Sequence, residues 1–230
     1  MKTHTLLLWD IDGTLVLSGG AGMRALKVTL EAVFEVKGSL SDIDFAGRTD
    51  KWITKRIFEK FEIEPSPENF DRFLSAYLEV LPVELSASSA TLLPGVKDLV
   101  QVASRTEGVT QGLLTGNLRK GAEAKLRLHS LWEYFPFGAF ADDSEYRNDL
   151  GPFALSRAQS HAGVVFPPER VWVIGDTPHD VACGKAIGAR TIGVATGGHH
   201  SVDDLLESRP TAVLRDLSDS ERFWSIVNGS

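Results

Sequence analysis

Near its amino end the chain reads Leu6-Leu7-Leu8-Trp9-Asp10-Ile11-Asp12-Gly13-Thr14, a short apolar run that ends in two carboxylates and a glycine. A continuous apolar run followed by turn residues is typical of a strand buried on both faces, as in a parallel sheet. The polar residues then stand at the carboxyl end of that strand. In open parallel sheets this is the edge where ligands bind.

Further apolar runs along the chain end in the same way. They cover residues 109–114, 171–174, 191–194 and, more weakly, 212–214, and helical patterns at 121–131, 152–162 and 179–187 separate them. Strands that alternate with helices predict an α/β fold with a Rossmann-like parallel sheet. The carboxyl ends of three of these strands carry Asp10, Thr115 and Asp176, so we expect polar chemistry to collect on one edge of the sheet.

The stretch before residue 93 breaks this alternation. Apolar residues recur at helical spacing from Met23 to Phe34 and again from Phe70 to Leu81, and Ser66-Pro67 resembles a helix start. We therefore predict an all-helical cap domain at residues 17–92, inserted into an α/β core domain made of residues 1–16 and 93–230. Gly19-Gly20 and residues 86–91 are the expected hinges.

Composition narrows the classes of protein that remain. The 230 residues are 43% hydrophobic and 24% charged with a net charge of −7, which is ordinary for a globular domain. No Lys/Arg-rich run indicates a nucleic-acid partner, and the first apolar run is too short for a signal peptide or membrane span. Cys183 is the single cysteine, so an intrachain disulfide is excluded. A cytoplasmic monomer or homodimer is expected.

The pair Asp10 and Asp12 suggests phosphoryl or proton chemistry. Two close carboxylates repel each other unless a cation or a shared proton neutralises them, and a hard cation such as Mg²⁺ prefers oxygen ligands. One carboxylate can attack phosphorus while the other moves protons. Gly13 would allow a tight turn and offer its N–H to a phosphate oxygen. The plainer alternative is a turn that ends a strand.

Two later segments repeat this arrangement. Thr115 ends a buried strand, so its hydroxyl and the N–H groups of Gly116 and Asn117 are candidate phosphate donors. Asp176 follows another strand and can complete an oxygen shell around a cation, with Asp180 binding directly, through water or as a support for another ligand. Ordinary helix caps before the next helices remain the alternative for both segments.

The ordered motifs resemble the haloacid dehalogenase-like (HAD) superfamily, in the phosphoglycolate phosphatase and β-phosphoglucomutase-like subgroup with a helical cap. The resemblance spans nearly the whole chain. It implies that Asp10 is the nucleophile and a Mg²⁺ ligand, and that Asp12 is the general acid/base and binds the metal through its backbone carbonyl. It also implies that Thr115 binds phosphate and that Asp176 ligates the metal.

One departure from the family concerns its usual lysine before the last motif. No lysine lies between Lys125 and Lys185, and Arg147 is the best substitute. Its charge would offset the repulsion between Asp10 and a phosphate dianion. An exposed arginine among acidic neighbours is the alternative, and Arg157 and Arg119 are weaker candidates.

The substrate expected from this resemblance is a small phosphorylated metabolite such as phosphoglycolate or a sugar phosphate. In related caps the loop that here contains Arg48 faces the site, so Arg48 is a candidate for holding an anionic tail. His199 and His200 are read as part of a flexible loop, and Thr49 or Asp50 as a helix cap.

Four other functions compete with a phosphatase. A sugar phosphomutase would keep Asp12, and a phosphonate hydrolase would need a cap lysine, for which Lys51 and Lys55 are faint candidates. A dehalogenase would have no use for Asp12 as a proton donor. A non-catalytic phosphate-binding protein is supported only by the arginine in place of the family lysine.

Overall fold

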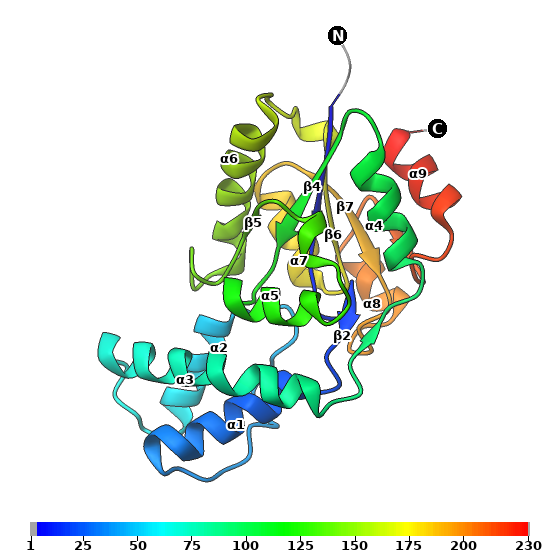
Figure 1. The fold of residues 1–230 in the computed structure, drawn as a ribbon. Coiled ribbons are helices and arrows are strands. Elements are labelled where there is room, and N and C mark those ends of the chain that lie inside the picture. The colour runs from blue at the N-terminus through cyan, green and yellow to red at the C-terminus, as the bar shows by residue number, and fades with distance from the viewer. Residues whose placement is uncertain (1–3, 230) are drawn as a thin grey trace.

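A six-stranded parallel sheet with helices on both faces forms the centre of the molecule in a computed structural model that describes residues 4–229 (Figure 1). The described strands are β1 (Thr5–Trp9), β2 (Val16–Leu17), β3 (Thr91–Leu92), β4 (Val109–Leu114), β5 (Gly138–Ala139), β6 (Val171–Gly175), β7 (Arg190–Val194) and β8 (Ala212–Leu214). The described helices are α1 (Ala21–Phe34), α2 (Asp50–Lys60), α3 (Pro67–Ser86), α4 (Val96–Arg105), α5 (Arg119–Arg127), α6 (Leu150–Ala162), α7 (Pro178–Ala186), α8 (Val202–Glu207) and α9 (Ser220–Asn228), with short 3₁₀ turns η1 (Trp132–Tyr134), η2 (Arg147–Asp149) and η3 (Pro168–Arg170). The predicted α/β class is confirmed.

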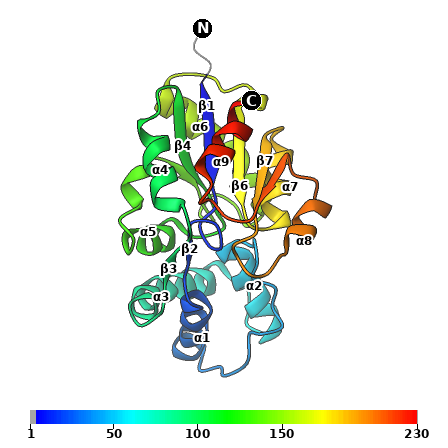
Figure 2. The same cartoon turned by 90° about the vertical axis from the view of Figure 1, so that its right-hand side faces the viewer.

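The strand order β5-β4-β1-β6-β7-β8 places β1 inside the sheet, paired in parallel with β4 on one side and β6 on the other. The chain builds one half of the sheet through β4 and β5 and then returns past β1 to build the other half. Such a reversal leaves a crevice at the carboxyl ends of the strands. The layer formed by α1, α2 and α3 lies beyond those ends (Figure 2).

Alternating side chains of β1 supply both faces of the sheet. Leu7 and Trp9 belong to one buried cluster, and the Trp9 ring stacks on Phe223 of α9 with centroids 5.6 Å apart. Leu6 and Leu8 belong to a second cluster under α6 and α7. A strand covered on both faces must be apolar throughout, which is why the sequence of β1 shows no polar alternation.

The three helices α1, α2 and α3 share a third buried cluster that includes Phe58, Phe73 and Tyr77. Ser66 caps α3 with Pro67 at its first position, as expected from the sequence. The cluster extends to Leu118 and Ala141, which lie on the sheet side.

The two chain segments that join this helical layer to the sheet pair with each other as β2 and β3. The predicted domain boundary at residues 16/17 falls inside β2 and the one at 92/93 directly after β3. Residues 1–3 and 230 of the predicted core lie outside the described part. The division into two domains stays a prediction.

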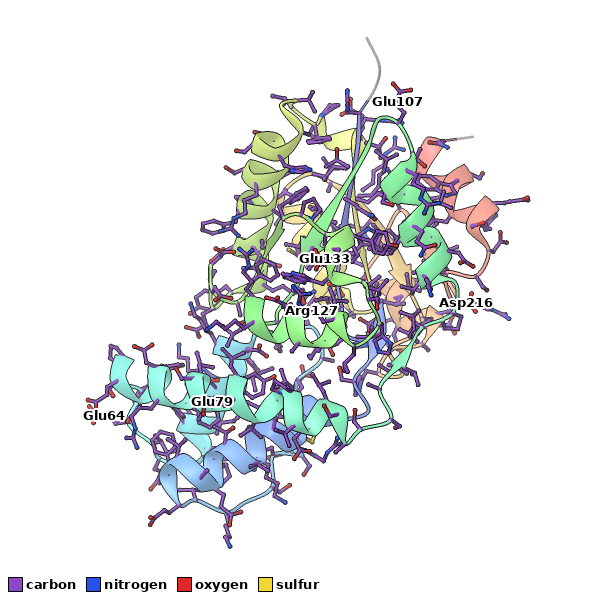
Figure 3. All side chains as sticks on the ribbon, viewed as in Figure 1. Glu64, Glu79, Glu107, Arg127, Glu133 and Asp216 are labelled. Carbon is purple, nitrogen blue, oxygen red and sulfur yellow. The ribbon has the colours of Figure 1, made fainter. Side chains whose placement is uncertain are left out.

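Two expectations about helices are wrong. The helix expected at 121–131 ends at Arg127, which pairs with Glu133 at 3.0 Å just past the helix (Figure 3), and Leu128 is 48% exposed. Met23 was expected on the buried face of its helix, yet it is 46% exposed. Among residues 4–229 no helix is long and apolar enough to cross a membrane.

Candidate active site

Asp10 lies buried at the end of β1, in contact with Arg147 of η2. Nη2 of Arg147 is 2.8 Å from Oδ1 of Asp10 and also pairs with Asp180. Burial raises the pKa of Asp10 to about 6, although the Arg147 charge opposes this rise. The alternative of an exposed arginine is therefore wrong, because Arg147 is buried between two carboxylates.

Three carboxylates gather at this edge of the sheet. One oxygen from each of Asp10, Asp176 and Asp180 lies within 4.8 Å of the other two. Burial, with the charges of Asp180 and Asp10, raises the pKa of Asp176 well above its usual range. A single guanidinium does not balance three carboxylates, so the donor set fits a hard divalent cation.

Asp180 also shapes the start of α7. Its Oδ2 accepts hydrogen bonds from the Thr177 N–H (3.0 Å) and hydroxyl (2.7 Å), while the Thr177 hydroxyl caps the Asp180 N–H. This capping box satisfies orphan donors at the helix start. The other carboxylate oxygen of Asp180, Oδ1, accepts from Arg147. The capping alternative is therefore confirmed for Thr177, and Asp180 still stands in the acidic cluster.

Gly13 has a role other than the one expected. Its N–H donates to the Val16 carbonyl at 2.9 Å, so the expectation that this N–H is free for phosphate is wrong. Gly13 adopts φ +81°, and a β-carbon there would overlap with the Asp176 carboxylate. The glycine thus allows β1 to turn closely past Asp176.

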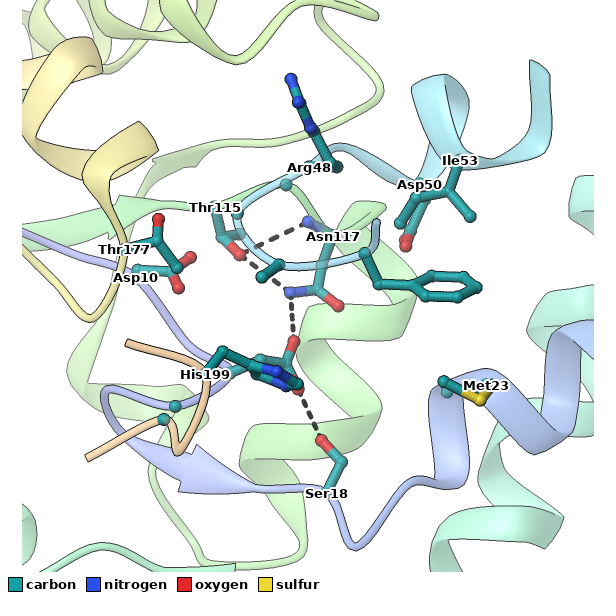
Figure 4. Close-up of a pocket in the computed structure, with 18 of the residues that line it drawn as sticks. Asp10, Ser18, Met23, Arg48, Asp50, Ile53, Thr115, Asn117, Thr177 and His199 are labelled. Carbon is teal, nitrogen blue, oxygen red and sulfur yellow. Dashed lines mark hydrogen bonds between the residues drawn. The ribbon is translucent and has the colours of Figure 1, made fainter. Parts of the chain in front are cut away.

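A hydrogen-bonded network joins Asp12 to the end of β4 (Figure 4). Asn117 Nδ2 donates to Asp12 Oδ2 at 2.9 Å and to the buried Thr115 hydroxyl at 2.8 Å. On the other side, Ser18 donates to Asp12 Oδ1 at 2.5 Å. The side chain of Asn117, and not only its N–H, therefore belongs to the site.

Lys125 of α5 completes this network. Its Nζ is 2.6 Å from Asp12 Oδ2 and 2.6 Å from Asn117 Oδ1. Burial alone would raise the pKa of Asp12, but Lys125, Ser18 and Asn117 outweigh it and hold that pKa below its usual range. Asp12 is thus kept as a carboxylate, bound to groups that are separate from the acidic cluster.

The helical layer sits directly on the loop after β4. The Asp50 N–H donates to the Gly116 carbonyl at 2.7 Å, and Asp50 Oδ2 accepts from the Leu118 N–H at 2.7 Å. Thr49 caps α2 by accepting from the Trp52 N–H, as predicted for this position. A β-carbon on Gly116 would overlap with the Arg48 carbonyl, so this close approach requires glycine.

Other predicted basic residues lie elsewhere. The Arg48 guanidinium stacks over Trp52 at 4.4 Å, pairs with Asp44 at 3.6 Å and points away from Asn117 (Figure 4). Arg157 pairs with Asp143 at 2.6 Å, and the guanidinium of Arg119 lies 5.9 Å from the ring of Phe140. Of the three arginines considered for the family lysine position, the structure brings Arg147 to Asp10.

These groups surround a pocket of about 380 Å³ between the sheet and the helical layer. Asp10, Thr115 and Thr177 line one side of it, and Met23, Asp50 and Ile53 the other (Figure 4). His199 lies at the pocket as well, although its sequence gave no reason to expect this. The pocket thus has a polar sheet side and a largely apolar helical side.

Sequence reasoning missed Lys125, although a signal was present. Gly121, Ala122, Lys125 and Leu126 are the buried positions of α5. Spacing of this kind marks the inward face of a helix, and a charged residue on that face needs a partner. The positions of Asp50, Met23 and His199 depend on packing between distant segments and carried no comparable signal.

Comparison with known proteins agrees with this geometry. A family model described as HAD-hydrolase-like matches residues 148–220. Phosphoglycolate phosphatase of Nitrosococcus oceani is 23% identical over 98% of both chains, and the probable phosphatase IndB of Dickeya dadantii is 28% identical over 93% of this chain and 90% of its own. The crystal structure of CbbY from Rhodobacter sphaeroides in complex with phosphate shares the fold, with a TM-score of 0.74, 21% identity and coverage of 94% and 96%.

The fold, the site and these matches define the class that the chain resembles: it is similar to hydrolases of the haloacid dehalogenase-like (HAD) superfamily. The relatives that it matches include phosphoglycolate phosphatase, and the chain is a phosphatase similar to them.

Proposed function

We propose that the protein is a Mg²⁺-dependent phosphatase that hydrolyses a small phosphate monoester through an aspartyl-phosphate on Asp10. The observation that carries this proposal is the buried cluster of Asp10, Asp176 and Asp180 with Arg147 at the carboxyl edge of the sheet. A cytoplasmic location and a monomeric or homodimeric state remain predictions.

The residues present fit a magnesium ion. Asp10 and Asp176 would hold it, with Asp12 contributing its backbone carbonyl and Asp180 binding directly or through water. When bound, Mg²⁺ supplies positive charge that offsets the charge of the phosphoryl oxygens. Because two of the cluster's carboxylates have raised pKa values, a cation there would also favour their ionised forms.

In the first half of the reaction, a carboxylate oxygen of Asp10 attacks phosphorus and the bond from phosphorus to the alcohol oxygen breaks. Arg147 reduces the repulsion between Asp10 and the incoming dianion, and Thr115 donates its hydroxyl to a phosphoryl oxygen. Lys125 first passes a proton to Asp12, because its Nζ is 2.6 Å from Asp12 Oδ2, and Asp12 then gives that proton to the leaving alcohol oxygen and is left ionised. The proton that Asp12 takes up in the second half returns to Lys125.

In the second half, Asp12 removes a proton from water, the water oxygen attacks phosphorus, and the bond to Asp10 breaks. The lowered pKa of Asp12 keeps it ionised for this step. Phosphate then leaves when the helical layer separates from the sheet, in the manner of other active-site lids.

The test is phosphate release from a panel of small esters with and without Mg²⁺, using wild type, Asp10→Asn and the control Asp98→Asn on the exposed side of α4. We expect Mg²⁺-dependent release by wild type and the control, and a loss of at least about 10³-fold in Asp10→Asn, since the nucleophile is removed. Equal release by all three proteins would refute the proposed role of Asp10.

Two alternatives are less well supported. A phosphonate hydrolase needs a cap lysine in the pocket, but Lys51 donates to the Asp142 carbonyl and Lys55 pairs with Glu145, and neither lines the pocket. A sugar phosphomutase would keep Asp12 but needs polar partners for several sugar hydroxyls, and the helical side of the pocket offers few. Product analysis with a hexose phosphate separates a mutase from a phosphatase.

A further inference from the structure

The helical side of the pocket is the part that the proposed mechanism does not use. Its apolar members are Leu17, Met23, Leu26, Phe45, Ile53 and the ring of Tyr77. Met23 and Leu17 are 46% and 37% exposed, although both lie within a concave site. Apolar groups exposed inside a pocket gain stability when an apolar ligand covers them.

The cations of the pocket are already engaged. Among the described residues that line it, the guanidinium and ammonium groups belong to Arg48, Lys125 and Arg147. Arg147 sits between Asp10 and Asp180, and Lys125 between Asp12 and Asn117. Arg48 is directed to Asp44 and Trp52.

The helical side instead presents a carboxyl group. Asp50 lines the pocket there, and burial raises its pKa to about 6, so it is largely ionised at neutral pH. Tyr77 is buried and its pKa lies well above its usual range, so its hydroxyl stays neutral. A second anionic group on a substrate would meet Asp50 there, and within residues 4–229 each guanidinium or ammonium group that lines the pocket already has a carboxylate partner.

We propose that the substrate is a phosphate monoester whose alcohol part is uncharged and presents an apolar surface to the helical side of the pocket. This inference rests on the proposed phosphatase activity. It further implies that phosphoglycolate, which carries a carboxylate beside its ester, is a poor substrate.

The test compares kcat/KM for benzyl phosphate, ethyl phosphate and phosphoglycolate in the presence of Mg²⁺. All three release alkyl-type alcohols, so the comparison avoids the intrinsic reactivity of a phenol leaving group. We expect benzyl phosphate to exceed phosphoglycolate by at least about 10-fold, with ethyl phosphate between them. Phosphoglycolate turnover equal to or above that of benzyl phosphate would overturn the inference and leave the phosphatase activity standing.

A variant that places a charge among the apolar residues of the helical side of the pocket provides a second, independent test. Met23→Lys places a cation on the helical side of the pocket and should raise kcat/KM for phosphoglycolate above that for benzyl phosphate. Met23→Leu should retain the wild-type order of kcat/KM values. Val28→Lys is the matched control, because Val28 is 44% exposed on the same helix and does not line the pocket. An unchanged preference in folded Met23→Lys contradicts the inference. No Mg²⁺-dependent release from any ester by wild type would instead reject the proposed function itself.

Discussion

At the scale of single residues, Lys125 stands out because it is a buried cation whose partners are a proposed proton carrier and the amide that orients it. Its ammonium group contacts both Asp12 and Asn117. A buried lysine needs such partners, since desolvation of an unpaired charge is costly. Its position therefore ties α5 to the proposed acid and base of the reaction.

We predict that Lys125→Met lowers kcat by about 10²-fold with little change in KM, since positioned acid and base groups contribute about 10² to 10⁴ to rates. Lys125→Arg should recover part of the loss because it retains the charge. Lys120→Met, at an exposed position of the same helix, should behave as wild type. Steady-state kinetics on the ester that wild type hydrolyses best provides the measurement, and a loss confined to KM would contradict the assignment.

The residues of the site differ in how far they could be predicted. Asp10, Thr115 and Asp176 follow apolar strands, and parallel strands bring their carboxyl ends to one edge, so their proximity follows from the pattern. Arg147 could be placed only by elimination among arginines. Asp50 reads locally as the first residue of a helix, and its contact with Leu118 joins segments 68 residues apart. No local pattern predicts an encounter that depends on how α2 packs on α5.

At the scale of elements, the start of α2 meets the start of α5 through one carboxyl group. Asp50 begins α2, yet its side chain accepts the Leu118 N–H next to the first turn of α5. Acceptors at a helix start satisfy amide groups that have no partner within the helix. Five of the six described strands of the main sheet were predicted almost to the residue, because short apolar runs bounded by turns define them, whereas the two-residue strands β2, β3 and β5 were not predicted. The helix expected at 121–131 could not extend to residue 131, because Ser130 adopts φ +55°.

This contact makes stability depend on pH in a defined direction. The Asp50 carboxyl titrates near its usual 3.8 when unfolded and at about 6 when folded, mainly because it is buried. Between these values the folded protein binds the extra proton, so the free energy of unfolding falls as pH rises. The contribution is fully present below pH 3.8 and lost above about pH 6.

We predict that Asp50→Asn, which keeps an acceptor but no charge, is more stable than wild type at pH 7 by up to about 3 kcal/mol, and that the two converge near pH 4. Urea unfolding at several pH values measures this difference. Asp71→Asn, on the exposed side of α3, is the control and should follow wild type. A difference between Asp50→Asn and wild type that does not vary with pH would rule out titration of Asp50 as its cause.

At the scale of the whole molecule, two glycines lie where the helical layer contacts the sheet side of the site. Gly116 faces the Arg48 carbonyl so closely that a β-carbon would overlap with it, and Gly47 faces Thr177 and His179 in the same way. The pocket closes between these contacts. Close contact between the helical layer and the sheet therefore requires glycine at positions 47 and 116.

We predict that Gly116→Ala separates the two parts while each keeps its fold, because Gly116 needs no positive φ and the overlap is chiefly with the seated Arg48 carbonyl. Small-angle scattering should show a larger radius of gyration, and proteases should cut faster at residues 86–91. Activity should fall by about 10²-fold, since small misplacements of reacting groups have effects of this size. Gly22→Ala, whose β-carbon would meet only ordinary contacts, is the control. An unchanged radius would show that the layer can shift to accept the methyl group.

Cys183 gives the molecule a property that is useful in the laboratory. This thiol is the single cysteine of the chain, it is buried beside the Arg147 carbonyl at 3.2 Å, and burial raises its pKa to about 12. A thiol that is both inaccessible and protonated reacts slowly with maleimides. One surface cysteine introduced on α3 and another on α4 would therefore accept a donor and an acceptor dye in the otherwise native chain, and opening of the pocket could be followed by energy transfer in single molecules.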